Sequence, residues 1–487
     1  HTVNMSFLDA VRAVARNKYF WIISLAGWIG FLEGSFGTIL GWMYNYQEAC
    51  SAGQYAVITA IAGNASLWPN LFAPFLIRRF GKKKVLIISN LLNIIFIALM
   101  LPVVKMTGGG VIWILLVFIF INQLLTSLGH FMNPSLNADI RDYQQYISGE
   151  RIDGVFSAVA LIGSVITLGT ASVLPAIYEK AGLNAEMAVK LGYSADNVYD
   201  VLYNTELFVA ISSVLIIASV IGATLNVIPL FFYDLTETKQ KAMVNVLRIR
   251  AYFDDKITGI ATSEQEAEVS EIIKTANEYA NKTPAKIEKG MPKQEKKHIR
   301  EDNEKIEIAK IVLAELEFFK TSRGEFEFEY SKKILSSQGE MDLTEEIAKI
   351  NSRPDNTTEE KEFKRKMRSL IKDFRIAEKT KNSKEYKNAE NFDSAIFTEL
   401  FNTSDNISFS IKELQNKIKL SKEAKEDTKE LKEKLSKLYK ERKVNDEKIK
   451  QARKKSILYN RANKPIITAQ KTLARYESYN SYINNLV

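Results

Sequence analysis

The sequence predicts an all-α membrane protein that crosses the bilayer several times and continues into a charged helical region. Six apolar runs of membrane-spanning length fill the first half of the chain, and about 17–25 such residues cross the hydrocarbon core. Residues 1–235 hold 13 basic and 13 acidic residues, so the net charge of +9 belongs to residues 236–487. We therefore expect the first half to lie in lipid and the second half in water.

These differences divide the chain into four parts. The predicted parts are a basic amphipathic lead-in at 1–18, a six-helix transmembrane domain at 19–234, an interfacial helix at 235–255 and a charged helical region at 256–487. Residue 1 is interpreted as a cut inside a longer protein, and a processed terminus is the alternative.

Each predicted span is a long apolar run bounded by polar or charged residues. The spans cover residues 19–44, 54–77, 85–104, 111–137, 154–178 and 206–232. Runs such as 111–125 have no polar face to offer water, which argues against a soluble protein with apolar core helices. Glycines recur in the first span, where small residues allow membrane helices to approach closely.

Basic residues in the short loops set the expected orientation. With the first residue inside, ten lie in inside segments: Arg12, Arg16, Lys18, Arg78, Arg79, Lys82, Lys83, Lys84, Arg141 and Arg151. Outside segments hold Lys105, Lys180 and Lys190. We therefore expect both ends in the cytoplasm and the spans in the plasma membrane, as in a bacterial inner membrane.

A few polar side chains fall at membrane depth. Glu33 lies mid-way along the first span, and Asn122 and His130 lie in the fourth. Because a charge in hydrocarbon costs several kcal/mol, such groups line a solute pathway or pair with one another. Interhelical hydrogen bonding is the alternative for each. Trp28 is a further pathway candidate that could stack on a sugar ring, with packing or lipid contact as the alternative.

The link between the fourth and fifth spans carries a long motif. It resembles the link between the tenth and eleventh helices of the glycoside–pentoside–hexuronide:cation symporters, the melibiose-carrier-like branch of the major facilitator superfamily. The positions that match the family form are Ala138, Asp139, Asp142, Tyr143, Gly149, Arg151, Gly154 and Ser157. The chain departs from that form at Gln144, Gln145 and Asp153.

A second resemblance lies between the second and third spans. The segment 78–84, with Arg78, Arg79, Lys82 and Lys83, is similar to the basic loop of the superfamily, although Arg78 stands where an acidic residue is usual. The six spans then correspond to helices seven to twelve. The resemblance covers residues 5–255, half of a twelve-helix transporter, so an amino-terminal six-helix half is an expected partner.

The resemblance implies cation-coupled uptake of a sugar or glycoside by alternating access, with two halves rocking around a midplane site. Asp139, Asp142, Tyr143 and Arg151 would form a cytoplasmic gate whose ion pairs reach the other half. The alternative is that Asp139 and Asp142 only cap helix ends and follow the topology.

Substrate and ion are less constrained by the resemblance. Ser164 stands where melibiose carriers have a lysine, and it is kept as a pathway candidate. The acidic cation site of that family lies in the first six helices, so the site for a coupling ion, Na⁺ or H⁺, is expected outside this chain. No other cofactor is expected.

The charged region shows helical patterns separated by polar breaks. Helices are expected at 267–280, 299–323, 326–336, 343–350, 358–379 and 384–402, with a long, partly coiled-coil-like helix at 408–460. Polar residues interrupt the apolar seam of the last stretch, so antiparallel hairpins fit equally well. The region offers surface for a cytoplasmic protein partner.

Several functions are disfavoured by composition. One cysteine and three histidines leave most catalytic and metal-binding constellations unavailable, so an enzyme is not expected. The Glu content that accompanies the Lys-rich runs indicates solvated helix faces, not nucleic-acid binding. Two alternatives to sugar transport stay open. One is a membrane sensor or scaffold that does not transport, and the other is a carrier of a lipid or peptide.

Overall fold

The computed structural model describes residues 11, 14–149, 163–257, 259–337, 341–423 and 427–484, all helical or loop, with no strand among them. They fall into two compact units. The membrane unit comprises residues 10–248 and 271–312, and the carboxy-terminal unit comprises 249–270 and 313–487. The expected all-α class is confirmed.

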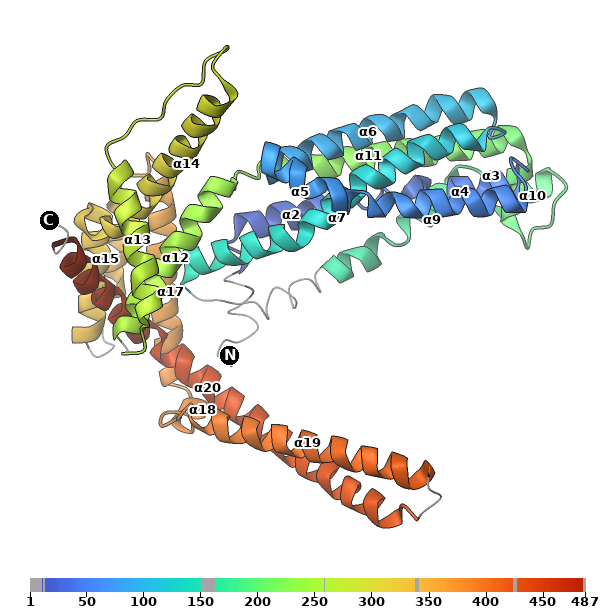
Figure 1. Cartoon of the computed structure of the whole chain (residues 1–487). Coiled ribbons are helices and arrows are strands. Elements are labelled where there is room, and N and C mark those ends of the chain that lie inside the picture. Colours follow the sequence, from blue (N-terminus) through green and yellow to red (C-terminus); the bar gives the residue numbers. More distant parts are fainter. Residues whose placement is uncertain are drawn as a thin grey trace. The chain divides into compact units, whose positions relative to one another are not determined.

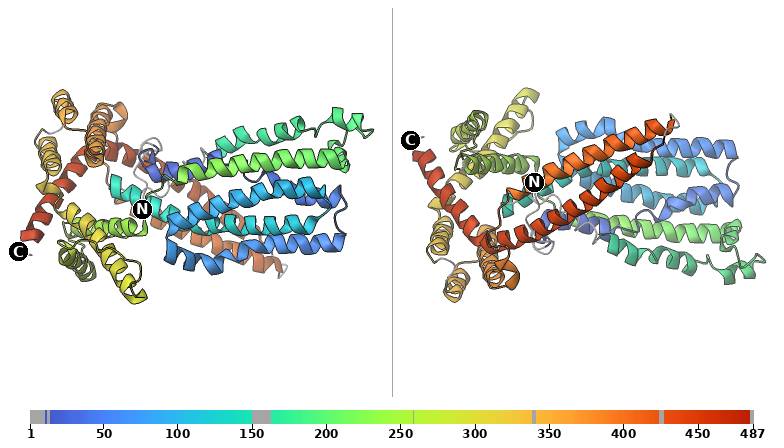
Figure 2. Two further views of the ribbon diagram at one scale, coloured as in Figure 1. Left: turned by 90° about the horizontal axis from the view of Figure 1, so that it is seen from above. Right: turned by 90° about the horizontal axis from the view of Figure 1, so that it is seen from below.

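The membrane unit is a bundle of long helices with shorter ones at its ends (Figure 1). Its elements are α2 (Lys18–Ile29), η1 (Ser35–Thr38), α3 (Ile39–Asn45), α4 (Ala52–Asn64), η2 (Ala65–Leu67), α5 (Pro69–Phe80), α6 (Lys82–Thr107), α7 (Ile112–Ser148), α9 (Val173–Lys180), α10 (Ala185–Lys190), η3 (Val198–Tyr203) and α11 (Thr205–Leu230). Within it α6 packs along both α7 and α11, and α11 packs along α2 (Figure 2).

Three helices of the described chain, α6, α7 and α11, are each long and apolar enough to cross a membrane. They match the third, fourth and sixth predicted spans. The first span is not one helix, because it breaks between α2 and η1, and the second breaks at η2 before Pro69. Glycine and proline at these points explain the breaks, since both weaken a helix interior. The fifth predicted span begins in residues outside the described part, and residues 163–170 are helical.

The motif-bearing link is also different from the expected loop. Residues 138–148 continue α7 for three more turns, and Gly149 ends the helix with a left-handed φ of 73°. Its N–H donates to the Gln145 carbonyl at 2.8 Å, which closes the last turn. Asp139, Asp142 and Tyr143 therefore stand on a rigid helix. Arg151, Gly154 and Ser157 lie outside the described residues.

A continuous helix, α12 (Glu237–Ile257), covers the predicted interfacial segment. It contributes its first turns to the membrane unit and its last turns to the carboxy-terminal unit. The helices α13 (Ser263–Tyr279) and α14 (Lys293–Leu316) follow, each also divided between the units.

The carboxy-terminal unit contains η4 (Phe318–Lys320), α15 (Ser322–Ser336), α16 (Leu343–Ser352), α17 (Thr358–Lys381), α18 (Lys384–Lys387), α19 (Ile396–Glu423) and α20 (Lys429–Asn484). The expectation of one helix over 408–460 is wrong. Instead α19 and α20 form an antiparallel hairpin (Figure 1), the alternative that the interrupted seam allowed. Phe397, Leu400, Ile449 and Ala452 form its buried contact. The second half of α20 packs on α15 and α17.

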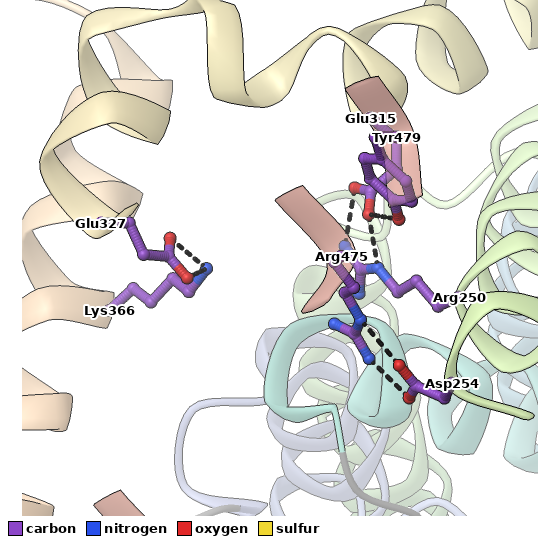
Figure 3. A network of polar contacts seen from close by, with 7 residues as sticks. All are labelled: Arg250, Asp254, Glu315, Glu327, Lys366, Arg475 and Tyr479. Carbon is purple, nitrogen blue, oxygen red and sulfur yellow. Dashed lines mark hydrogen bonds and ion pairs between the residues drawn. The ribbon is translucent and has the colours of Figure 1, made fainter. Parts of the chain in front are cut away.

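A largely buried ionic network holds the end of α20 in this unit (Figure 3). The Arg250 guanidinium donates to both carboxylate oxygens of Glu315, from Nε at 2.7 Å and from Nη2 at 2.8 Å. The Tyr479 hydroxyl donates to Glu315 Oε1 at 3.1 Å. Arg475 holds Asp254 in the same two-pronged way, at 3.1 and 2.9 Å. Planar guanidinium–carboxylate pairs of this kind are the stronger ion pairs in proteins.

The network predicts an acid-sensitive contribution to stability. Burial acts to raise the pKa of Glu315, but Arg250 and the other donors outweigh it and hold that pKa below the ordinary value. A depressed pKa in the folded state adds stability above the unfolded pKa, about 4.3 for Glu, and loses it as the pH falls further. The protection factors of the α20 amides, which correct for the intrinsic pH dependence of exchange, should therefore fall in wild-type protein below about pH 4.3. Glu315→Gln should weaken that fall. An equal loss of protection at low pH in wild type and Glu315→Gln would show that Glu315 does not titrate as described.

Candidate functional site

A polar cluster surrounds Glu33 at the break of the first span. Asn93 Nδ2, from the middle of α6, donates to Glu33 Oε1 at 2.6 Å. Asn226 Nδ2, near the end of α11, donates to Oε2 at 2.9 Å. Asn122 of α7 donates in turn to Asn93 Oδ1. Four segments far apart in sequence thus meet around one carboxylate, which we call the Glu33 cage.

The break itself is shaped by the neighbouring helix α11. The Phe36 N–H, which lost its helical partner at the break, donates to Ser219 Oγ of α11 at 3.0 Å. A Cβ built on Gly222 would lie 2.4 Å from the Glu33 nitrogen, and one on Gly30 would lie 2.7 Å from the Asn226 Cβ. Both glycines are therefore required for the close approach that brings Asn226 to Glu33.

This approach gives a direct test. Gly222→Ala is expected to push α11 away from the break and to destabilise the membrane unit by about 1–3 kcal/mol, the usual cost of overpacking. Thermal unfolding of the purified protein measures it. Gly129→Ala is the matched control, because a Cβ at Gly129 meets no atom within 4 Å. Equal melting temperatures for the two variants would contradict the close packing.

The exposed face of α7 carries polar residues along about four turns. Residues at three- and four-residue steps point outward from the bundle there: Gln123, Thr126, His130, Asn133 and Asn137. We call this set the α7 polar stripe. Its neighbour Asn122 faces inward and is buried. Because polar groups at membrane depth are costly in lipid, such a face is typical of a water-filled path or a protein contact. His130 therefore belongs to this exposed face and lies outside the hydrogen bonds of the cage.

Trp28 and Ser164 lie together, away from the cage hydrogen bonds. A Cβ on Gly163 would lie 2.8 Å from Trp28 Nε1, so the indole packs on the helix that carries Ser164. Trp28 also contacts Trp21 edge-on, with ring centroids 5.9 Å apart. These contacts fit the packing interpretation of Trp28. Ser164 is exposed.

A second cluster joins the basic loop to the end of α7. Lys82 Nζ lies 2.5 Å from Asp139 Oδ2, and both side chains are largely buried. Glu237, at the start of α12, accepts a hydrogen bond from the Lys82 backbone N–H. Gln240 of α12 donates to Asp142 Oδ2 at 3.3 Å. We call these five residues the α6–α7 latch. It ties Asp139 to a partner within this chain.

Local backbone geometry explains the position of Glu237. Gly81 has a left-handed φ of 82°, and a Cβ there would lie 2.8 Å from the Glu237 carboxylate. The carboxylate thus caps the amino end of α6, where the helix dipole favours negative charge. Of the other basic-loop residues, Arg78 and Arg79 are exposed and Lys83 is half-buried, and no ion pair of theirs is seen among the described residues.

Aromatic residues support the latch beside α2. Tyr19 packs edge-on against Tyr143 and Tyr233, with ring centroids 4.6 and 5.3 Å away. The Tyr19 hydroxyl donates to Asp234 Oδ1 at 2.7 Å, and Lys18 pairs with the same carboxylate at 3.0 Å. Burial acts to raise the pKa of Asp234, but these two donors outweigh it and lower that pKa. Tyr143 therefore has a packing role in the latch.

Several members of these clusters are not predicted from the sequence. Tyr19, Glu237 and Gln240 were not singled out, and Gly222 was not distinguished from other small residues. An acidic residue directly after the last span and opposite a basic loop was the available signal for Glu237. No sequence signal marks the contact between Gly222 and the Glu33 backbone, because it depends on the break of the first span.

The comparison with known families bears on this same region. A family model described as MFS/sugar transport protein matches residues 2–237. Over this stretch the chain is similar to sugar transporters of the major facilitator superfamily. The comparisons with curated proteins and with solved structures gave no match. The matched stretch includes the Glu33 cage, the α7 polar stripe and the latch as far as Glu237, and it ends before most of α12.

The superfamily match supports a secondary transporter of sugars, a class that works in lipid on small solutes and is typically not enzymatic. It agrees with the three apolar helices that can cross a membrane. Among the described residues, no group of three or more His, Cys, Asp or Glu side chains is arranged to hold a metal ion.

Proposed function

We propose that the protein takes up a sugar or glycoside by cation-coupled symport through alternating access. The melibiose-carrier-like motif on α7 is the basis for this branch of the superfamily. The observation that carries the proposal is the α7 polar stripe, because five outward polar residues on a membrane helix need a partner other than lipid. An amino-terminal six-helix half would face it, with the solute between.

In this proposal the stripe and the cage have different roles. His130 and the exposed amides of the stripe contact the solute, since a sugar needs both donors and acceptors. Asn122 lies behind them and connects the stripe's helix to Asn93 and Glu33. Ser164 and Trp28 lie at the edge of the pathway. Both chain ends face the cytoplasm, and the membrane is the plasma membrane.

The α6–α7 latch serves as the cytoplasmic gate element of this half. Asp139 is held by Lys82 in the described state, so it exchanges partners only when that pair opens. Arg151 and Asp142 are the groups proposed to reach the other half. A pair with this degree of burial stabilises one state by a few kcal/mol without locking it. The carboxy-terminal unit is proposed to bind a protein partner.

The test is uptake of labelled mono- and disaccharides by cells that express the full-length protein. His130→Ala should lower the uptake rate at least tenfold through loss of solute contacts, about 1.4 kcal/mol. Val117→Ala is the matched control: Val117 is exposed on α7, and at 3.6 residues per turn it lies almost opposite the stripe. The control should transport at the wild-type rate.

Two results would contradict the proposal. No uptake of any sugar, with normal surface expression, would favour a sensor or scaffold that uses the carboxy-terminal unit. Uptake of a lipid or peptide, unaffected by His130→Ala, would favour a carrier with an apolar pathway.

A further inference from the structure

We propose that Glu33 is a proton-exchanging site of the transport cycle, so that this six-helix half carries a coupling site of its own and the coupling ion is H⁺. The inference rests on the proposed symport function. It departs from the family resemblance, which places the cation site in the other half. The proton is taken from water and returned to water, and no other reactant is needed.

The first support is the isolation of the Glu33 carboxylate. Among the described residues, other acidic side chains lie at or just beyond the ends of the predicted spans, such as Asp139, Glu179 and Glu206. Both hydrogen bonds to Glu33 come from neutral amides, those of Asn93 and Asn226. Neutral donors solvate a carboxylate, but they do not cancel its charge. In lipid, such a group is costly as an anion and cheaper as an acid.

The second support is that the cage suits both protonation states. An Asn amide has two donors and one acceptor, and a half-turn of its terminal torsion exchanges them. With Asn226 turned, its carbonyl oxygen accepts the O–H of protonated Glu33 at the same place. Asn93 and Asn122 can turn in the same way as a linked pair, because Asn122 donates to Asn93 Oδ1. No backbone movement is required.

The third support is the setting of the carboxylate. Glu33 sits in the break between α2 and η1 and is neither sealed nor fully exposed. In the proposed cycle, water reaches its partly exposed side from the solute pathway. The polar groups near Glu33 come from three packed helices: Asn93 from α6, Asn122 and His130 from α7, and Asn226 from α11. His130 is the titratable group within electrostatic range, and it belongs to the proposed solute face.

This position links the proton to the solute. A solute on the α7 polar stripe would displace water beside His130, which lies within electrostatic range of Glu33. The contacts also favour a proton over Na⁺. The donor–acceptor distances of 2.6 and 2.9 Å leave no room for an ion between Glu33 and its amides. Na⁺ would need the amides both to turn and to move apart around it, whereas a proton needs only the turn of Asn226.

The experiment uses the full-length protein in proteoliposomes, with Glu33→Gln as the fixed mimic of the neutral acid. Asn90→Ala is the matched control, because Asn90 lies on the same helix as Asn93 and its amide bonds only to Leu86 of its own helix. An inward gradient of about one pH unit should drive up to about tenfold sugar accumulation at one-to-one coupling. Counterflow exchange of labelled sugar needs no net proton movement and reports solute binding and reorientation.

We expect Glu33→Gln to retain counterflow and to lose accumulation, while Asn90→Ala retains both. Accumulation by Glu33→Gln at the wild-type level would overturn the inference. Accumulation by the wild type with a Na⁺ gradient but not with a proton gradient would also overturn it, yet would leave the proposed symport intact. If the wild type shows neither accumulation nor counterflow, that result contradicts the proposed function itself.

A second measurement needs no sugar. Infrared difference spectra of the reconstituted protein between two pH values should contain a carboxylic-acid C=O band that is absent from Glu33→Gln. Asn226→Ala should move the pH midpoint of that band, because it removes one cage hydrogen bond, and Asn90→Ala should leave it in place. A spectrum identical in wild type and Glu33→Gln, or a midpoint unaffected by Asn226→Ala, would contradict proton exchange at Glu33.

Discussion

Arg250→Met is expected to destabilise the carboxy-terminal unit by about 3–5 kcal/mol, the usual cost of leaving one partner of a buried ion pair alone. Among the described residues, Glu315 would keep only the Tyr479 hydroxyl as a hydrogen-bond donor while it stays largely buried. Methionine preserves most of the packing volume, so the lost charge is the main change. Because these residues fix the end of α20, the effect should be largest there.

Native-state hydrogen exchange on the full-length protein measures this prediction. Amides in the last turns of α20 should exchange faster in Arg250→Met by the factor that this free energy implies. Lys417→Met is the control, since Lys417 forms an exposed i,i+4 pair with Glu413, and such pairs contribute about 0–1 kcal/mol. A change no larger than the control would show that the network adds little stability.

Asp139→Asn should have the second large effect. It removes the anion from Lys82, whose side chain is 17% exposed, and leaves a buried ammonium without its counter-charge. At about 3 kcal/mol or more, the latched state would be disfavoured by roughly a hundredfold. If the latch holds one state of the cycle, sugar uptake should slow by at least tenfold while the protein still inserts.

Asp142→Asn provides the comparison for this prediction. Asp142 accepts one long hydrogen bond, 3.3 Å from Gln240, so its loss should slow uptake less than that of Asp139. Wild-type kinetics in both variants would instead support the interpretation that these residues only cap helix ends. Surface biotinylation controls for insertion in each case.

Local patterns predicted the class of the fold but not the break of the first span. Apolar runs located α6, α7 and α11 because hydrophobic length is a property of consecutive residues. The first span was expected as one helix, yet it breaks at Gly30, and Ser219 of α11 satisfies the freed backbone. That contact joins residues 183 positions apart, which no local pattern reports. The interrupted apolar seam is similarly compatible with one long helix or with a hairpin such as α19–α20.

The candidate site was predicted in residue type more than in arrangement. Glu33, Asn122 and His130 are site candidates in the sequence because polar groups at membrane depth are costly unless they are paired or solvated. The structure places Glu33 and Asn122 in one hydrogen-bonded cage and His130 on a separate exposed face. For Asp139, the motif predicted a gate residue but not its partner Lys82, because that pairing depends on α7 extending as a helix past residue 138.

Sugar uptake into proteoliposomes is the most direct test of the account. Vesicles that contain the full-length protein should take up a labelled sugar faster than protein-free vesicles, with a rate that saturates as sugar concentration rises and falls in His130→Ala. Uptake equal to that of protein-free vesicles for every mono- and disaccharide tried, with correctly inserted protein, would contradict sugar transport.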